Sequence, residues 1–340
     1  EKILNNNNYT YFISEIGLNH NGSVDIVKDL IRISKECGAD AVKLQKRDVE
    51  NLATRKILDA ADNRFPEFGS TYREIRQHLE FNHAQYLEIK EFCKETKIDF
   101  ICTAFDIISA KFLINLGIDY FKIASHSLTH VQLLKFLSDE KIPCILSTGM
   151  SEMEDIDLAH SIFKKNDVEH VFLHCVSSYP TPDDEVNIDI IDTLTDRYKV
   201  IIGYSGHEIG YFSTLIAVAK GARVVERHIT LDKKMIGFDH SLSLEPEELK
   251  LLIRDIRKIE TLRGTNVKKV TDVELFKKNQ YNVSMIANQD IKKGTILDES
   301  HIEYKNPGTG ILHKDSKLVL GKKTNQNINK DTIIDVKMFN

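Results

Sequence analysis

One strand, helix and strand unit decides the fold of this chain: residues 199–232, KVIIGYSGHEIGYFSTLIAVAKGARVVERHITLD. Its β-branched runs KVIIGYS and RVVERHI predict buried strands, and STLIAVAKG between them predicts a helix closed by glycine. The second run ends in three ionisable residues, Glu226, Arg227 and His228. A charge removed from water needs a partner, a metal or a catalytic role, so this strand end is a candidate site.

The same unit recurs along the first 230 residues. Six further runs predict strands: YFISEIG, DAVKLQ, DFICTAF, DYFKIAS, PCILSTG and HVFLHC. Amphipathic stretches such as VDIVKDLIRISKECG and HAQYLEIKEFCKET separate most of them. Strands that alternate with helices pair in parallel, and eight at a spacing of roughly 20 to 30 residues favour a (β/α)8 (TIM) barrel of the α/β class over an open sheet.

The pattern divides the chain into three parts. We expect a barrel domain over residues 1–262, a charged linker over 263–281 and a small β-rich domain over 282–340. A flexible tail is the alternative to the last domain. Within the barrel, the segment 46–81 is too long and too polar for an ordinary loop, and its part FGSTYREIRQHLEF predicts a lid or wall over the barrel mouth.

The composition is that of a soluble globular protein. Hydrophobic residues make up 41% and charged residues 29%, and the net charge of -5 disfavours binding to nucleic acid. No apolar run approaches the roughly 18 residues that span a bilayer, and the first ten residues lack a signal-peptide core, so we expect no membrane association. The five cysteines lie far apart, mostly in apolar runs, which indicates reduced thiols in a cytoplasmic protein.

Polar residues follow seven of the eight predicted strands, at the ends where TIM barrels place reactive groups. Only the third strand, which ends in residues 103–106, offers no candidate, and we expect no site residue from it. In chain order, the candidates are Glu15, Lys43, Gln45, Lys122, Ser125, Ser147, Ser177, Tyr179, His207, Glu226 and His228.

Two histidines predict a metal site. His207 and His228 are 228 − 207 = 21 residues apart, one strand and helix step, so we expect them on neighbouring strands about 4.8 Å apart. Two imidazoles placed in this way bind one divalent ion and leave positions for water or substrate. Two hydrogen-bonded histidines without a metal are the alternative. Glu226 shares the strand face of His228, whereas Arg227 is expected to pair with the helix layer.

Two lysines and two serines predict an anion site. Lys43, Lys122, Ser125 and Ser147 lie at the ends of the second, fourth and fifth predicted strands, and ammonium and hydroxyl groups together bind a phosphate or carboxylate. Surface lysines that flank strands are the alternative. Glu15 either orients or deprotonates water or pairs with a lysine. A desolvated Lys122 also allows a Schiff-base aldolase mechanism, although that mechanism does not need the two histidines.

Eight motifs in register make the sequence resemble the sialic acid synthase family, which makes nonulosonic acids. They are SEIGLNHNG, GADAVKLQ, FKIAS, LSTGM, HCVSSYPTP, GYSGHE, ERHITLDK and FDHSLSLEP, and the tail motifs IKKGTIL, NPGTGI and LGKK extend the resemblance. It implies a TIM barrel followed by an antifreeze-like (β-clip, SAF) domain. It also implies a transferase of class EC 2.5.1, as in EC 2.5.1.56, which condenses phosphoenolpyruvate with an N-acetylated hexose such as N-acetylmannosamine and releases phosphate.

Position by position, the resemblance implies a role for each candidate. His207 and His228 match ligands of a divalent metal, with Mn2+ first and Mg2+ or Co2+ as further options, and Glu15 matches a glutamate that handles the attacking water. The substrate-binding positions are Lys43, Lys122, Ser125, Ser147 and Tyr179 for phosphoenolpyruvate, and Gln45, Asp239 and Asn306 for the sugar side. Ser177 is a further substrate-binding candidate.

Three positions depart from the family pattern. Ser127 stands where an acidic residue is usual, Ser177 where asparagine is frequent, and Asn306 where arginine commonly precedes Pro-Gly. Because Ser127 and Asn306 belong to the sugar side, a legionaminate or pseudaminate synthase and an inactive sugar-binding barrel remain alternatives. The resemblance also implies a domain-swapped homodimer, in which Asn306 approaches the partner's sugar site.

Overall fold

Eight parallel strands close into a barrel in the computed structural model, which describes residues 9–340. Each strand pairs with the next along the chain, and the eighth pairs with the first. This arrangement confirms the predicted TIM barrel. The strands are β1 (Tyr11–Gly17), β2 (Ala41–Lys46), β3 (Asp99–Ala104), β4 (Phe121–Ile123), β5 (Cys144–Ser147), β6 (His170–Cys175), β7 (Ile202–Gly206) and β8 (Val224–His228).

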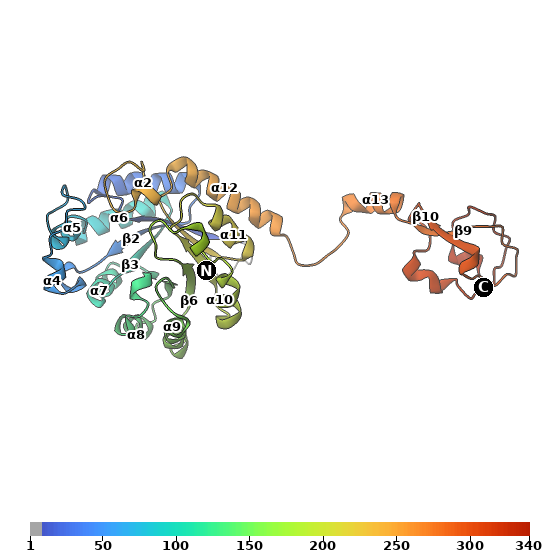
Figure 1. The fold of residues 1–340 in the computed structure, drawn as a ribbon, viewed down its shortest axis with the longest axis horizontal. Helices are drawn as coiled ribbons and strands as arrows, with labels where there is room; N and C mark the ends of the chain where they lie inside the picture. Colours follow the sequence, from blue (N-terminus) through green and yellow to red (C-terminus); the bar gives the residue numbers. More distant parts are fainter. Residues whose placement is uncertain (1–8) are drawn as a thin grey trace. The chain divides into compact units, whose positions relative to one another are not determined.

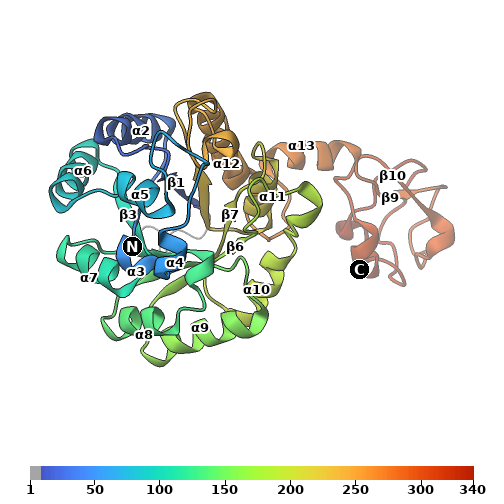
Figure 2. The same ribbon diagram turned by 60° about the vertical axis from the view of Figure 1, so that its left-hand side comes forward.

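A ring of helices surrounds the barrel (Figures 1 and 2). Local sequence sets their ends: in the first helix the Ser23 side chain accepts a hydrogen bond from the Ile26 N–H, and Gly38 ends the helix with a φ of 93°. Within residues 9–340, no helix is both long and apolar enough to cross a membrane. The ring contains α2 (Val24–Cys37), α6 (His83–Thr96), α7 (Ile107–Asn115), α8 (Val131–Asp139), α9 (Met153–Lys165), α10 (Ile190–Tyr198), α11 (Phe212–Lys220) and α12 (Pro246–Arg263).

The long connection after β2 contains three short helices, α3 (Val49–Leu52), α4 (Arg55–Leu58) and α5 (Tyr72–His78). A capping box sets the start of α5, because the side chains of Thr71 and Glu74 satisfy each other's backbone N–H groups. Ile75 and Leu79 then pack on Leu18, which follows β1. This packing holds the segment against the C-terminal end of the barrel, where it forms part of the wall that the sequence predicted.

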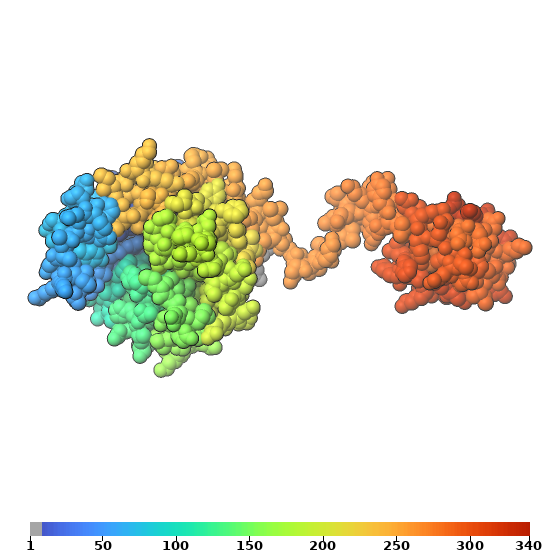
Figure 3. Space-filling model, in the orientation of Figure 1, coloured from blue at the N-terminus to red at the C-terminus, as the bar shows by residue number. Residues whose placement is uncertain are grey.

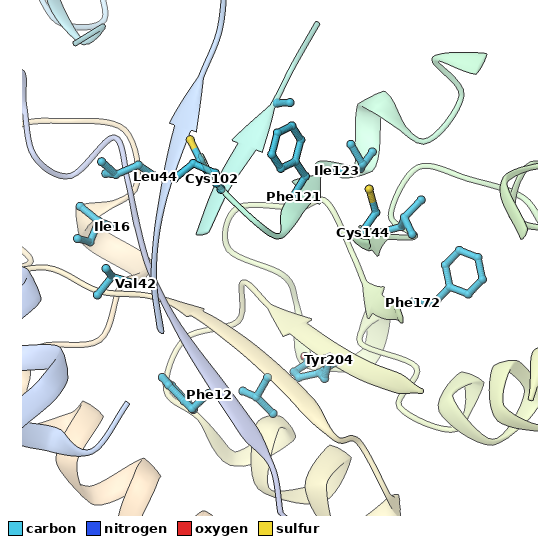
Figure 4. Close-up of a cluster of buried hydrophobic side chains, with 14 of the residues drawn as sticks. Phe12, Ile16, Val42, Leu44, Cys102, Phe121, Ile123, Cys144, Phe172 and Tyr204 are labelled. Atoms are coloured by element: carbon cyan, nitrogen blue, oxygen red, sulfur yellow. The ribbon is translucent and has the colours of Figure 1, made fainter. Parts of the chain in front are cut away.

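The alternation of side chains along each strand separates two cores. Outward residues such as Phe12, Val42, Phe121 and Phe172 pack under the helices (Figure 4). Inward apolar residues fill the N-terminal part of the barrel and leave the C-terminal part to polar side chains. These inward residues are Tyr11, Ile13, Ala41, Ile101, Ile145, Val171, Leu173 and Val224.

Residues 265–340 form a second compact unit (Figure 3). It begins with α13 (Asp272–Tyr281), so most of the segment expected as a linker is helical. The short strands β9 (Ser284–Ala287) and β10 (Ile302–Lys305) pair antiparallel. The unit has its own buried core, which makes it a folded β-rich domain and not a flexible tail. Its core residues are Met285, Ala287, Ile291, Leu297, Ile302, Ile311, Val319, Ile328, Ile334 and Phe339.

Six single 3-10 turns complete the described secondary structure. They lie in connections, and two of them, Ser125–Ser127 and His240–Leu242, follow β4 and β8 at the polar end of the barrel. The other four are Asp183–Glu185, Glu299–His301, His313–Leu318 and Val336–Met338.

A buried ion pair joins β8 to the helix layer. The Arg227 side chain is 1% exposed and donates hydrogen bonds to the Glu208 carboxylate and to the Thr214 hydroxyl of α11. It also donates to the carbonyl oxygens of Glu208 and Gly210. The predicted orientation of Arg227, away from Glu226 and His228, is confirmed.

We expect Arg227→Met to lower the free energy of unfolding by about 3–5 kcal/mol, because it leaves the Glu208 carboxylate buried and unpaired. The matched control is Arg197→Met, which breaks the solvent-exposed pair with Asp157 and should leave the unfolding midpoint almost unchanged. Urea titration followed by circular dichroism measures both. Equal midpoints for the two variants would contradict this prediction.

Candidate active site

A cavity of about 280 Å³ lies at the C-terminal ends of the strands. Every site residue that the sequence predicted in the barrel lines it, whereas Asn306 lies in the second unit. The predicted residues around the cavity are Glu15, Lys43, Gln45, Lys122, Ser125, Ser147, Ser177, Tyr179, His207, His228 and Asp239.

The third strand also contributes residues to this cavity, so the prediction that its end provides no site residue was wrong. Thr103 and Phe105 line the cavity, and the Lys43 Nζ donates a hydrogen bond of 2.9 Å to the Thr103 hydroxyl. A threonine inside an apolar run has the sequence signature of a β-branched core residue. Its role as a hydrogen-bond partner becomes visible only when β2 and β3 lie side by side.

Four charged side chains form a network at the base of the cavity. The Lys43 Nζ lies 3.1 Å from a Glu15 carboxylate oxygen and 3.4 Å from the Glu226 Oε1, and the Lys122 Nζ lies 3.8 Å from the same Oε1. All four side chains are at most 5% exposed. The two lysines are therefore internal and not surface residues, and Glu15 does pair with a lysine.

The network changes the ionisation of its members. Burial favours the neutral form of Glu226, but the charges of Lys122 and Lys43 outweigh it and hold the pKa of this carboxyl below its usual value. Burial likewise lowers the pKa of Lys43, but Glu15 and Glu226 outweigh it, so this pKa is raised. For Lys122 burial dominates and lowers the pKa, since Glu226 offsets it only in part and the charge of Lys43 lowers it further.

Gly17 allows the first strand to approach both halves of the site. Its φ of 57° lies in the left-handed region, and the pairing of β1 with β2 is shifted between Glu15 and Gly17. A Cβ at Gly17 would lie 3.1 Å from the Glu15 Oε1 and 3.4 Å from the His228 Cε1. At the same place the Gln45 Nε2 donates to the Glu15 Oε1 over 2.7 Å, which holds this carboxylate in position.

Serine hydroxyls and a glycine form a small cradle beside Lys122. The Lys122 Nζ donates to the Ser147 Oγ over 2.6 Å, and the Gly149 N–H donates to the Ser125 Oγ over 3.2 Å. The Ser177 Oγ is buried without a hydrogen-bond partner. A Cβ at Gly149 would lie 2.4 Å from the Ser177 Oγ, so the backbone approaches the hydroxyls closely. Such a set of donors suits a phosphate or carboxylate.

The two predicted histidines lie side by side at the ends of β7 and β8. Their ring centroids are 5.5 Å apart, and the Tyr179 ring lies 4.1 Å from that of His207. The His207 Nδ1 lies 2.9 Å from the Val176 carbonyl oxygen, so Nδ1 carries the hydrogen and the neutral ring has its lone pair on Nε2. The His228 Nδ1 is buried without a hydrogen-bond partner and lies 3.7 Å from the Asp239 Oδ2.

The donor set fits an open metal site. In the described part of the chain, no three His, Cys, Asp or Glu side chains group closely enough to make a complete metal cage. Two imidazoles with an unengaged nitrogen fit a site whose other ligands come from water and substrate. The rings are not hydrogen-bonded to each other, but the divalent ion itself stays a prediction.

Two arginines at the cavity mouth escaped the sequence-based prediction. Arg47 follows β2 and stacks over the Phe105 ring at 4.1 Å, and Arg76 of α5 stacks over the Phe238 ring at 4.6 Å. Both arginines and both rings line the cavity together with His126. The sequence offered only a weak signal for them, because Arg47 is a single basic residue beside a predicted strand end and Arg76 is another in the predicted lid.

A second cavity of about 890 Å³ lies at the opposite, N-terminal end of the barrel. It is lined mainly by apolar residues and strand starts, including Tyr11, Asp99, Tyr120 and Val171. It contains none of the predicted site residues. Because catalytic groups of TIM barrels come from the C-terminal strand ends, the smaller polar cavity is the candidate active site.

Comparisons with known proteins agree with this geometry. The NeuB family model matches residues 30–268, and the SAF domain model matches residues 282–340. Human N-acetylneuraminate-9-phosphate synthase is 36% identical over 95% of this chain and 91% of its own length. The N,N'-diacetyllegionaminic acid synthase of Campylobacter jejuni is 37% identical over 96% of this chain and 98% of its own length.

A solved structure is similar over most of its length. The crystal structure of N-acetylneuraminic acid synthetase from Leptospira borgpetersenii, in complex with citrate, has a TM-score of 0.70 and 32% sequence identity. The match covers 80% of this chain and 90% of that one. Together with the family model and the two relatives, it means that this chain belongs to the NeuB family of sialic and related nonulosonic acid synthases.

Proposed function

We propose that the polar cavity condenses phosphoenolpyruvate with an open-chain 2-acetamido hexose and water, to give a nonulosonic acid and inorganic phosphate. The observation that carries this proposal is the serine cradle beside the buried lysines. The unpartnered Ser177 hydroxyl and the close approach of Gly149 leave donors that a phosphate or carboxylate would use. The two histidines line the same cavity.

The reaction forms one C–C bond and replaces the C–O bond between C2 and the phosphate by a C–O bond to water. The C3 carbon of phosphoenolpyruvate attacks the aldehyde carbon of the sugar, the oxygen of water adds at C2, and phosphate leaves with the bridging oxygen. A divalent ion held by His207 and His228, with Mn2+ as first choice, would polarise the aldehyde oxygen. Three carbons of phosphoenolpyruvate and six of the hexose make the nine-carbon chain of the product.

The remaining residues bind and orient the reactants. Lys43, Lys122 and the serine cradle offset the negative charges of phosphoenolpyruvate and of the departing phosphate. Glu15, held by Gln45, orients the water that adds at C2 and accepts its proton. Asp239, which lines the cavity beside His228, faces the sugar.

The identity of the sugar sets the product. N-acetylmannosamine would give N-acetylneuraminate, the reaction of EC 2.5.1.56, and its 6-phosphate would give the 9-phosphate, because condensation places three carbons before C1 of the hexose. The 2,4-diacetamido-trideoxy hexoses would give legionaminate or pseudaminate. All three classes share the same condensation chemistry.

Incubation with phosphoenolpyruvate, Mn2+ and this panel of sugars tests the proposal. We expect release of inorganic phosphate and a nine-carbon acid, identified by mass spectrometry, with at least one sugar, and we expect a chelator to stop both. Absence of phosphate release with every sugar of the panel would refute the proposal and favour an inactive sugar-binding barrel.

A Schiff-base aldolase is the second candidate, because burial lowers the pKa of Lys122. Its ammonium group, however, donates to the Ser147 hydroxyl and lies near the Glu226 carboxylate, which favours a charged group that binds anions. Borohydride treatment with pyruvate separates the two mechanisms. A covalent pyruvate adduct of Lys122 that forms equally well in the presence of chelator would support the aldolase.

We expect His207→Ala and His228→Ala each to weaken Mn2+ binding by at least about 10–100-fold and to abolish turnover, because each removes one of two protein ligands. His83→Ala, in an exposed position at the start of α6, is the control and should bind Mn2+ like the parent protein. Titration calorimetry measures the affinity without relying on activity. Unchanged Mn2+ binding in both site variants would show that Mn2+ does not bind at these two histidines.

We further propose that two chains form the domain-swapped homodimer implied by the sequence, with Asn306 near the partner's sugar site. Apolar side chains on α13 support a partner surface, since Val273 is 79% and Phe276 72% exposed. Light scattering at assay concentration should give twice the mass of the chain. A fully active monomer would contradict the dimer.

A further inference from the structure

Arg76 is a cation without an anionic partner at the cavity mouth. It lines the cavity, it forms no ion pair with a described residue, and its Nε is buried without a hydrogen-bond partner. The guanidinium instead packs over the Phe238 and Tyr72 rings at 4.6 Å and 4.9 Å. Stacking fixes the plane of the guanidinium. A side-chain hydrogen bond joins Arg76 to Tyr72, whereas the Arg76 Nε stays without a partner.

Arg47 adds a second positive charge that is only partly offset. Its guanidinium stacks over Phe105 and donates to the Gln45 Oε1 over 2.5 Å. The nearby Glu80 carboxylate lies 3.5 Å from Arg47 but 2.8 Å from Lys46. One carboxylate is therefore shared by two cations, and Arg76 adds a third positive charge to this side of the cavity.

The surplus of positive charge lowers the pKa values of groups at the cavity mouth. Burial lowers the pKa of Arg76, and the charge of Arg47 lowers it further. Burial also lowers the pKa of His126, followed by the charges of Arg47, Lys122 and Arg76. An anion at the mouth would relieve all of these repulsions.

Ser127 supplies no negative charge that would offset this surplus. It is buried and uncharged at a position where the family resemblance leads one to expect a carboxylate. The positive charges of Lys43 and Lys122, at the base of the cavity, are balanced, because two carboxylates, Glu15 and Glu226, lie beside them. The unbalanced positive charge is thus confined to the mouth of the cavity, at Arg47 and Arg76.

We propose that Arg47 and Arg76 bind a phosphate ester on the hexose, so that the sugar substrate is a 2-acetamido hexose 6-phosphate and the product a nonulosonate 9-phosphate. This inference rests on the proposed function and selects one of its substrate classes. Two guanidinium groups match the oxygens of a phosphate through paired N–H donors. A hydrogen-bonded chain from Glu15 through Gln45 to Arg47 joins the reacting end of the cavity to this anion site.

Phosphoenolpyruvate is the other source of an anion in this cavity. The serine cradle and the buried lysines already offer donors for its phosphate and carboxylate. The two sources differ in kinetics, because an arginine that binds phosphoenolpyruvate sets its KM with every sugar, whereas one that binds the ester affects only phosphorylated sugars.

The test compares N-acetylmannosamine with its 6-phosphate in the full-length protein, with Mn2+ present and product measured by mass spectrometry. We expect kcat/KM for the 6-phosphate to exceed that for the neutral sugar by at least about 100-fold. Arg76→Gln should lower this preference about 10–100-fold, mainly through the KM of the sugar, which is the effect of losing a charged hydrogen bond. Arg76→Lys should retain part of the preference.

Arg73→Gln is the matched control, because Arg73 lies on the same helix, pairs with Glu50 and Asp59, and does not line the cavity. It should retain the parental preference. An equal or greater kcat/KM for the neutral sugar, activity only with diacetamido hexoses, or a loss in Arg76→Gln that follows the KM of phosphoenolpyruvate would overturn the phosphate site while leaving the condensation intact. No turnover of any sugar would overturn both proposals.

Discussion

The buried charge network of Lys43, Lys122, Glu15 and Glu226 is the constraint on which the active end of the barrel depends. Removing an ion from water costs several kcal/mol, so each of these groups needs an opposite charge within a few ångströms. Glu226 on β8 meets Lys43 on β2 only because β1 lies between the two strands in a closed barrel. Closure of the sheet therefore brings the opposite charges together, and their pairing offsets the cost of burying them at the centre of the barrel.

This balance also explains why further cationic groups surround the network. Two lysines facing two carboxylates provide little net charge for a trianionic phosphoenolpyruvate. In the proposed reaction, neutral donors from the serine cradle and a divalent ion held by the histidines would add what the network lacks. The cavity thus has an electrically balanced base and a positively charged mouth at Arg47 and Arg76.

The two folded units differ in the size of their hydrophobic cores. The barrel buries enough apolar surface to position every cavity residue by itself. The second unit has a much smaller core, which is marginal for independent stability and is consistent with a domain that gains stability from a partner.

Local patterns in the sequence determined most of this molecule. Period-two and helical runs predict the barrel, and the rule that strand ends converge predicts the residues around the cavity, from Glu15 to His228. Thr103, Arg47 and Arg76 were missed for one physical reason. A hydroxyl in an apolar strand, or an arginine in a loop or lid, has no local signature of function, because its partners come from other strands and helices.

Only the tertiary structure decided which charges are paired. The sequence by itself determined that lysines, carboxylates and histidines occupy the strand ends, but ion pairing acts through space and not along the chain. Lys43 is balanced because β1 and β8 bring two carboxylates to it, whereas Arg76, on α5, forms no ion pair with a described residue. That difference, set by packing, distinguishes a charge that is paired inside the barrel from one that is not.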